Sequence, residues 1–300
     1  MKILRILFKL LIALVVVVVT ALGLVYWRSS ALLAQHIEVR EPALTIPVDA
    51  EALARGEHIA ITRGCTDCHE KDLGGRVLVE AFPIGRLAAP NLTRGKGGAG
   101  ARLDAASLER AVRHGLGEGG RMLLYMPTTD FHALTDADMA DLIAYVSAVA
   151  PVDRDVPAPT AGPLMRTLFV LDKAPLAYAL RIDQHAAHAA SVAPAASADY
   201  GRYLAHSCTG CHGEHFSGGR VPGTPPSFPP ARNITPDPVD GIGKWSKEDF
   251  SAAVRMGKRP DGSTLNTFMP WKAFATLSDM ELDALWAYLQ TVPAQATGGH

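Results

Sequence analysis

A five-residue motif that occurs twice constrains this chain more than any other feature. Residues 65–69 read Cys-Thr-Asp-Cys-His and residues 208–212 read Cys-Thr-Gly-Cys-His, and together they use all four cysteines of the 300-residue chain. Cys-x-x-Cys-His is the spacing of c-type haem attachment, in which two thiols about one helical turn apart each add to a porphyrin vinyl group. The adjacent histidine then becomes the proximal ligand of the iron. The motifs predict two covalently bound haem c groups, held by Cys65, Cys68, His69, Cys208, Cys211 and His212.

Three other uses of such a motif fit less well. A structural zinc site wants four ligands close together, whereas each motif offers two thiolates and one histidine. A thioredoxin-like redox pair belongs in a βαβ unit, and no strand-rich pattern flanks either motif. Two disulfides would leave the histidine after each second cysteine unexplained.

The two motifs belong to a duplicated unit. Cys65 and Cys208 are 143 residues apart, and Met126 and Met269, each followed by proline, have the same offset. An internal repeat of this kind predicts two copies of one fold. Further pairs at this offset are Phe131 and Phe274, Leu134 and Leu277, Leu142 and Leu285, Tyr145 and Tyr288, and Val149 and Val292.

Start and stop signals predict an all-α fold, with three or four helices and long loops around one haem in each unit. Capping-box patterns at Thr135 and Ser278 open the last helix of each unit. The first helices carry Gly56 and Gly201, which would allow a close approach of the last helix. The remaining expected boundaries are helix starts near Asp49 and Asp199, helices from Asp104 to Gly115 and from Ser246 to Gly257, and loops over Gly85–Gly100 and Pro222–Gly243.

Each iron also needs a sixth ligand or an open position, and Met126 and Met269 are the expected ligands. Both precede proline at the matched offset. A thioether ligand favours ferrous iron and raises the reduction potential. Methionine is more often a core residue, but the matched position within a repeat of haem units outweighs that use. Met122 and Met256 are weaker rivals because their repeat partners are not methionine.

Several polar residues keep two interpretations. Backbone carbonyls near Pro90 or Ala231 are candidate acceptors for the second ring nitrogen of each haem histidine. Arg76, Arg220, Asn91, Asn233 and Trp245 would bind haem propionates or serve as loop and packing residues. Linker histidines are usually solvated, so ligation by His185 and His188 is the less favoured reading. His58, His132, His206 and His215 have no histidine as repeat partner and are interpreted as surface or core polar residues.

The N-terminus predicts a membrane anchor. Lys2, Arg5 and Lys9 precede Leu10–Trp27, which are 18 residues without a charge. That length suits a spanning helix better than the shorter apolar region of a cleaved signal peptide, the competing interpretation. The basic residues would remain in the cytoplasm and everything after Arg28 would lie in the periplasm of a bacterial inner membrane.

These signals divide the chain into six segments. We expect an anchor at 1–28, a tether at 29–48, a first haem domain at 49–150, a Pro- and Ala-rich linker at 151–198, a second haem domain at 199–292 and a tail at 293–300. The formal net charge of −1 and the lack of a basic tract argue against a nucleic-acid partner.

The order of motifs resembles class I cytochrome c domains. Each unit has Cys-x-x-Cys-His, Gly-Gly-Arg, Asn-Leu/Ile-Thr, Ala-Val-Arg-x-Gly, Met-Pro and a capped helix with a tyrosine. Asn233-Ile234-Thr235-Pro236 and Met269-Pro270-Trp271 are similar to the cytochrome subunits of periplasmic alcohol, aldehyde and gluconate dehydrogenases. The chain departs from them in having two haem motifs, where those subunits commonly carry three, and an N-terminal anchor.

The resulting hypothesis is an electron carrier rather than an enzyme. Electrons would arrive from a dehydrogenase or a quinol-oxidising complex and leave toward another cytochrome or a terminal oxidase, with no small-molecule substrate. A di-haem peroxidase is the alternative, but it needs one iron with an open distal position, which matched methionines on both irons argue against. A haem-based sensor would need an output module, and eight residues follow Val292.

Overall fold

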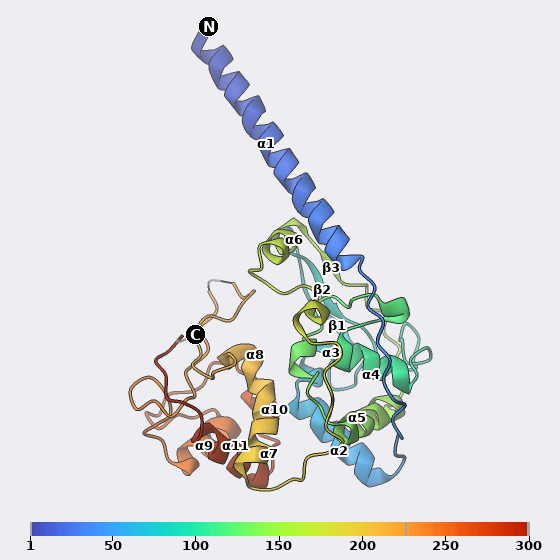
Figure 1. The fold of residues 1–300 in the computed structure, drawn as a ribbon, viewed down its shortest axis with the longest axis vertical. Helices are drawn as coiled ribbons and strands as arrows, with labels where there is room; N and C mark the ends of the chain where they lie inside the picture. Colours follow the sequence, from blue (N-terminus) through green and yellow to red (C-terminus); the bar gives the residue numbers. More distant parts are fainter. Residues whose placement is uncertain (1, 226, 299–300) are drawn as a thin grey trace.

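The computed structural model describes residues 2–225 and 227–298, and its N-terminal helix stands apart from the rest of the chain. Helix α1, Lys2–Leu33, projects from a body formed by the two haem units (Figure 1). It is long and apolar enough to cross a membrane, and none of its most apolar window is buried. The helix continues five residues beyond the expected end of the anchor at Arg28.

The first unit is built around two long helices. Its elements are α2 (Ala50–Thr62), α3 (Cys65–His69), β1 (Arg76–Ala81), β2 (Gly85–Ala89), α4 (Ala105–His114), η1 (Glu118–Gly120), η2 (Thr128–Asp130) and α5 (Asp136–Ala148). The linker holds β3 (Thr160–Ala161), α6 (Pro163–Val170) and η3 (Tyr178–Arg181).

The second unit repeats the helical part of the first. Its elements are α7 (Ala198–Ala205), η4 (His206–Cys208), α8 (Thr209–His212), α9 (Lys247–Met256), α10 (Trp271–Phe274) and α11 (Asp279–Leu289). Helix α7 begins one residue before the expected Asp199. Over the described part of 222–243 there is no regular helix or strand, in agreement with the predicted loop.

The helix boundaries follow the capping signals. Thr135 caps α5 by accepting a hydrogen bond from the N–H of Asp138, and Ser278 forms a full capping box with Glu281 at α11. At the other end of α4, Gly115 has a φ of 68°, the left-handed conformation that glycine adopts at helix C-termini. The expected helices over 104–115, 246–257 and after residues 135 and 278 are therefore confirmed.

The first and last helices of each unit cross at a glycine. A β-carbon on Gly56 would lie 2.1 Å from the backbone oxygen of Asp141 and 2.7 Å from Cβ of Tyr145. In the second unit a β-carbon on Gly201 would lie 1.9 Å from the oxygen of Ala284 and 2.8 Å from Cβ of Tyr288. The predicted close approach of these helices is confirmed in both units.

The all-α prediction misses a small antiparallel sheet. Strand β1 pairs with β2, and β2 pairs with the two-residue β3 of the linker, in the order β1-β2-β3. The loop expected over 85–100 was therefore wrong at its start, where Gly85–Ala89 forms β2. Residues 76–81 contain valines that favour extended backbone, and the third strand comes from a segment more than 70 residues away, which no local pattern reveals.

The linker is docked on the first unit rather than free. The apolar stretch 164–182 was expected to lie across a domain surface, and α6 does so next to the end of α1 (Figure 1). The guanidinium of Arg166 donates to the hydroxyls of Ser29 (2.8 Å) and Ser30 (3.1 Å) and lies 4.5 Å from the centre of the Tyr26 ring. These contacts fix the end of α1 on the body formed by the two units.

The two units also contact each other directly. Nε2 of His58 in the first unit lies 2.9 Å from a carboxylate oxygen of Glu281 in the second. Nη1 of Arg63 donates to the backbone oxygen of Leu204 at 3.0 Å. The hydroxyl of Tyr203 donates to the carboxylate of Asp138. The contact surface is therefore polar and directional, as expected of a contact between two domains of one chain.

Candidate haem sites

The first Cys-x-x-Cys-His motif forms the short helix α3. Gly64 precedes it with a φ of 77°, which allows the sharp turn from α2. His69 is 7% exposed, and its Nδ1 lies 2.9 Å from the backbone oxygen of Pro90, one of the two loop positions expected from the sequence. A carbonyl can only accept, so Nδ1 carries the proton and Nε2 presents its lone pair. This is the orientation that an iron-ligating histidine requires.

The second motif has the same arrangement on η4 and α8. Nδ1 of His212 donates to the backbone oxygen of Arg232 at 2.6 Å, one residue beyond the expected Ala231. Burial lowers the pKa of both His69 and His212, against the opposing effect of these hydrogen bonds. Both imidazoles are consequently neutral near pH 7 and available as ligands.

The four cysteines are unpaired thiols. All of them lie in described parts of the chain, and none forms a disulfide. Burial raises the pKa of Cys65 to about 12 and that of Cys208 to about 11. Thiols in such surroundings do not provide the low-pKa thiolates of redox-active cysteines. The alternatives of disulfides and of a thioredoxin-like pair therefore receive no support.

The two Met-Pro segments have the same local turn. The N–H of Thr128 donates to the oxygen of Met126 at 2.8 Å, and the N–H of Trp271 donates to the oxygen of Met269 at 2.8 Å. Met126 packs on the same core of the first unit as Cys65. Met126 and the first cysteine of α3 are thus packed against one hydrophobic core.

The rival methionines lie elsewhere. Met122 is buried in a separate cluster with Leu116, Ala177 and Ala179, under the docked linker. Met256 is 55% exposed at the end of α9. These positions suit a core residue and a surface residue, and Met126 and Met269 remain the predicted axial ligands.

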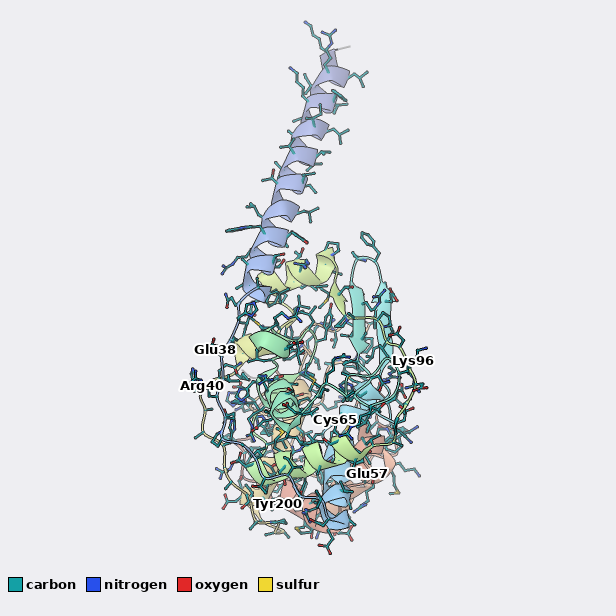
Figure 2. The ribbon with its side chains drawn as sticks, turned by 90° about the vertical axis from the view of Figure 1, so that its right-hand side faces the viewer. Glu38, Arg40, Glu57, Cys65, Lys96 and Tyr200 are labelled. Atoms are coloured by element: carbon teal, nitrogen blue, oxygen red, sulfur yellow. The ribbon has the colours of Figure 1, made fainter. Side chains whose placement is uncertain are left out.

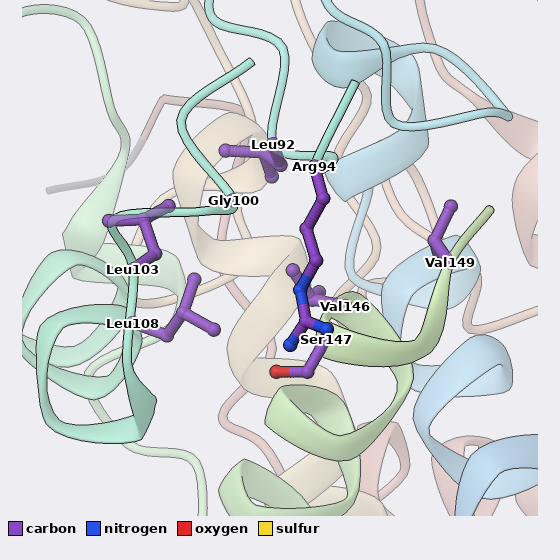
Figure 3. Close-up of a pocket in the computed structure, with 8 residues that line it drawn as sticks. All are labelled: Leu92, Arg94, Gly100, Leu103, Leu108, Val146, Ser147 and Val149. Carbon is purple, nitrogen blue, oxygen red and sulfur yellow. The ribbon is translucent and has the colours of Figure 1, made fainter. Parts of the chain in front are cut away.

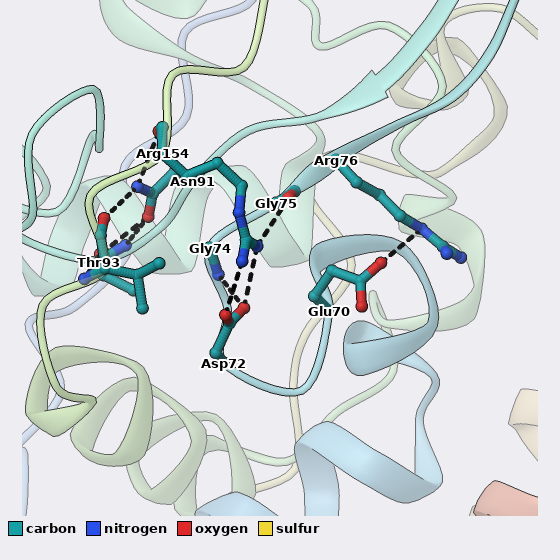
Figure 4. A network of polar contacts seen from close by, with 9 residues as sticks. Glu70, Asp72, Gly74, Gly75, Arg76, Asn91, Thr93 and Arg154 are labelled. Atoms are coloured by element: carbon teal, nitrogen blue, oxygen red, sulfur yellow. Dashed lines mark hydrogen bonds and ion pairs between the residues drawn. The ribbon is translucent and has the colours of Figure 1, made fainter.

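The Asn-x-Thr segments anchor loops. Oδ1 of Asn91 accepts from the N–H of Thr93 at 2.9 Å and from its hydroxyl at 2.8 Å, while Nδ2 donates to the backbone oxygens of Val152 (2.7 Å) and Arg154 (3.0 Å) (Figure 4). Arg154 also forms an ion pair with Asp72 at 2.9 Å in the same network.

The second unit repeats this use of asparagine. Oδ1 of Asn233 accepts from the N–H of Thr235 at 2.8 Å, and its Nδ2 donates to the backbone oxygen of Gln295 at 2.6 Å. Asn91 and Asn233 are 1% and 3% exposed, and both ends of each amide have partners. Of the two interpretations kept open for these asparagines, the geometry favours the structural one.

Arg76 and Trp245 also contact other protein residues, so neither needs a haem propionate as a partner. Nη2 of Arg76 donates to the backbone oxygen of Asp67 at 2.7 Å, and its Nε lies 3.0 Å from the carboxylate of Glu70 (Figure 4). Trp245 packs against the core of the second unit. For these two residues as well, packing is the role that the contacts support.

A small pocket lies beside α5 in the first unit. It has a free volume of about 10 Å³ between the start of α4 and the end of α5 (Figure 3). That space holds at most one water molecule. Its lining residues are Leu92, Arg94, Gly100, Leu103, Leu108, Val146, Ser147 and Val149.

A group of histidines outside the haem motifs was not anticipated. His188, expected to be solvated, has a buried Nε2, and it lies beside His114 and His132. His185, the other linker histidine, is exposed. The repeat could not reveal this group because its members have no histidine at the matching positions of the second unit.

Comparison with known proteins identifies the family. The model of the cytochrome c family matches residues 53–150 and 198–293. The chain is 43% identical over 94 residues, 29% of its length, to the cytochrome c subunit of gluconate 2-dehydrogenase from Pantoea cypripedii, of which 21% is covered. It is 40% identical over 94 residues, again 29% of its length, to the cytochrome c subunit of a quinone-dependent alcohol dehydrogenase from Gluconobacter oxydans, of which 20% is covered.

A third relative is described as a di-haem protein. It is a c-type cytochrome from Cereibacter sphaeroides, 36% identical over 61 residues, which are 20% of this chain and 21% of that protein. The matches span about a fifth of the length of these relatives. Family matches over both haem-motif units cover more than half of the sequence. The chain belongs to the cytochrome c family.

Proposed function

We propose that this protein is a membrane-anchored di-haem cytochrome c that carries electrons in the periplasm. It would accept electrons from a respiratory or periplasmic dehydrogenase and pass them to a terminal oxidase or another cytochrome. The observation that carries the proposal is the duplication of one geometry, in which a Cys-x-x-Cys-His helix places a histidine with Nδ1 held by a backbone carbonyl.

The residues of each unit have separate roles in this proposal. Cys65 and Cys68 attach one haem, and Cys208 and Cys211 attach the other. A bound haem supplies a one-electron redox centre. The hydrogen bonds at Nδ1 orient the histidines and strengthen them as ligands, and the methionines at 126 and 269 complete the coordination. Electron transfer by a haem held in this way would require no bond to a substrate.

Direct contact between the units supports internal transfer. The hydrogen bond between His58 and Glu281 and the hydrogen bond from Arg63 to Leu204 tie α2 and the residue that follows it to the second unit. His206, two residues before Cys208, has its Nε2 2.8 Å from the backbone oxygen of Thr129 in the first unit. The haem-attachment segment of the second unit is thereby held next to the segment that follows Met126.

The N-terminal helix supports attachment to a membrane. The exposed apolar side chains of α1 surround the helix on all sides (Figure 2). A helix that is apolar all round needs an apolar environment. We therefore propose that residues 1–28 anchor the protein in the bacterial inner membrane and that both haem units, 49–150 and 199–292, lie in the periplasm.

The relatives favour a dehydrogenase as the electron donor. Two of them are cytochrome c subunits of a gluconate dehydrogenase and of an alcohol dehydrogenase. A corresponding role for this chain is part of the proposal. The di-haem peroxidase alternative gains nothing from these relatives, and no observation on the described residues favours it.

A haem count and a ligand-binding assay test the proposal. The alkaline pyridine spectrum of the purified full-length protein should give two haems per chain, and a Cys208→Ala/Cys211→Ala variant should give one. The reduced wild type should bind carbon monoxide poorly because both irons are already six-coordinate. A single haem, or rapid binding of carbon monoxide at one of two haems, would contradict the carrier proposal.

A further inference from the structure

Four side chains converge on one point at the flank of the first unit, away from both haem motifs in sequence. Ligand atoms of Glu41, His114 and His188 all lie within 4.8 Å of one another. The ring of His132 lies 5.1 Å from that of His188 and 6.2 Å from that of His114, centre to centre. The four residues, which we call the flank cluster, come from the tether, from α4, from the segment before α5 and from the linker.

The cluster contains buried nitrogens without partners. Nε2 of His114, His132 and His188 are all buried, and none makes a hydrogen bond to a described residue, although a carboxylate oxygen of Glu41 lies 3.2 Å from Nε2 of His114. The side chain of His114 is fully buried. Unpaired buried polar atoms are rare in native proteins and call for a specific explanation. Three of them in one cluster point to a missing common partner.

The hydrogen bonds of the rings show what that partner must be. Nε2 of Gln184 donates to the backbone oxygen of Ala179 at 2.8 Å, which fixes the amide so that its oxygen faces Nδ1 of His114 at 2.9 Å. Nδ1 of His132 lies 3.0 Å from the backbone oxygen of Arg113. Both Nδ1 atoms must therefore donate, and in the neutral rings both Nε2 atoms present lone pairs.

The acidic member of the cluster makes the arrangement complementary to a cation. A carboxylate oxygen of Glu41 lies 3.2 Å from Nε2 of His114. A carboxylate facing a lone pair is repulsive unless a proton or a metal ion lies between them. Nδ1 of His114 already donates to Gln184 and its side chain is fully buried, so a bound cation at Nε2 would relieve this repulsion.

Two carboxylates offset the positive charge of Arg113, which lies beside the cluster. Arg113 is fully buried, and its guanidinium lies 3.3 Å from the carboxylate of Glu109 and 3.0 Å from that of Asp136. These two acids balance its charge, so Glu41 remains available to a bound cation. A backbone carbonyl, such as that of Arg113 at Nδ1 of His132, is also a usual outer partner of a metal-ligating histidine.

The segments that carry the ligands are held by other contacts. The N–H of Ile37 donates to the oxygen of Gly120 at 3.1 Å, and Leu44 packs on the core of the first unit, so the tether is attached on both sides of Glu41. Figure 2 shows Glu38 and Arg40 on the outer flank of this unit. Just after His188, the oxygens of Ala189 and Ala190 each accept from the start of α5 at 3.0 Å. Little ordering would remain to be done on binding.

We propose that the flank cluster is a divalent transition-metal site, with Glu41, His114 and His188 as ligands and His132 as the fourth. Imidazole nitrogens with one carboxylate suit zinc, and a closed set of four ligands is typical of a structural site. Tetrahedral zinc places its nitrogen and oxygen ligands roughly 3.3 Å apart, so small side-chain rotations would complete the site. The ion would join the membrane tether, α4 and the interdomain linker, and so fix the haem units relative to the anchor.

Zinc binding by the haem-loaded full-length protein tests the proposal. After treatment with a chelator, the detergent-purified protein is loaded with Zn²⁺, desalted and assayed for zinc by mass spectrometry, with its affinity measured by calorimetry. We expect one zinc per chain in the wild type and a loss of affinity of at least about tenfold in His188→Ala. His185→Ala is the matched control, because it removes an exposed histidine of the same linker, and it should bind like the wild type.

A second variant and a spectrum guard against misfolding and against binding at cysteines. Glutamine has nearly the same shape as glutamate, and the side chain of Glu41 is 24% exposed. The Glu41→Gln variant should therefore fold while binding zinc more weakly. X-ray absorption at the zinc edge should give nitrogen and oxygen neighbours at about 2.0–2.1 Å. Three results would each overturn the proposal. They are a wild-type protein that retains no zinc, zinc affinities of His188→Ala and Glu41→Gln equal to that of the wild type, and sulfur in the coordination shell of the zinc.

Discussion

Gly201 and Ala284 touch through their backbones, since a β-carbon on Gly201 would lie 1.9 Å from the backbone oxygen of Ala284. Gly56 has the same relationship to Asp141 in the first unit. The crossing of the first and last helix is therefore a fixed feature of both units. Each crossing holds the helix that leads into a Cys-x-x-Cys-His motif.

Replacing Gly201 by alanine should destabilise the second unit. Alanine in a helix normally gains about 1 kcal/mol over glycine, but here the added methyl meets backbone that cannot move aside. Overpacking of this kind costs about 1 to 3 kcal/mol. We expect a lower free energy of unfolding in guanidinium, measured by circular dichroism. Gly23→Ala, where no atom lies within 4 Å of the added carbon, should not lower it, and an equal loss of stability in both variants would contradict the crossing.

The contact between the units should depend on pH through Glu281. Burial raises the pKa of this carboxyl, but hydrogen bonds from His58 and Ser278 outweigh it, and the net shift is downward. A lowered pKa in the folded state contributes stability that is present above the unfolded value of about 4.5 and is lost as the pH falls through the folded value. The free energy of unfolding should therefore fall more steeply below about pH 4.5 in the wild type than in Glu281→Gln.

His58→Gln separates the interdomain contact from the helix cap in that experiment. It keeps the hydrogen bonds between Ser278 and Glu281 and removes the imidazole that contacts Glu281. It should lose part of the acid sensitivity, whereas identical pH profiles for all three proteins would contradict the role of the pair.

Asp130 should make the reduction potential of the second haem unit depend on pH. Its carboxylate lies against Gly210 within the second motif, where an added β-carbon would be 2.8 Å from Oδ2. Burial raises the pKa of Asp130 to about 6, against smaller opposing effects of Thr129 and Arg63. As the pH rises through 6, the carboxylate becomes negative and favours ferric iron nearby, so the potential should fall.

The matching variant is Asp130→Asn. Potentiometric titration between pH 5 and 8 should give this variant a flatter profile and a higher potential at pH 8 than the wild type. Asp172→Asn changes an exposed acid, with a side chain 84% exposed, and should behave like the wild type. An unchanged profile in Asp130→Asn would rule out this residue as the source.

Replacing Asn91 should lower the stability of the protein more than it changes the reduction potential of the haem. Its replacement by alanine leaves the N–H of Thr93 and the backbone oxygens of Val152 and Arg154 without their present partner. Each buried group left unpaired costs about 1 to 3 kcal/mol. Thermal unfolding should therefore occur at a clearly lower temperature, with little change in the potential. A large change in potential with unchanged stability would instead indicate a propionate ligand.

Features set by local signals could be predicted from the sequence. Each helix cap, at Thr135 and Ser278, acts within one helix, and each close-approach glycine, Gly56 and Gly201, acts at one helix crossing. The repeat shows each of these patterns twice. Strand β2 and its pairing with Thr160 were missed because the partner strand is distant in the sequence and the glycines of 85–100 favour a loop. The flank cluster was missed for a related reason. Glu41, His114 and His188 meet only because the tether and the linker both fold back onto the first unit.

The central claim is that each unit is a complete six-coordinate haem module with Met126 or Met269 as its sixth ligand. The methionine–iron charge-transfer band of the ferric protein tests it most directly. Each single variant, Met126→Ala or Met269→Ala, should lose about half of the band in proportion to the two haems, and Met256→Ala, at an exposed residue, should keep it. The account predicts that the band is absent from the Met126→Ala/Met269→Ala double variant, and its survival there would contradict the account.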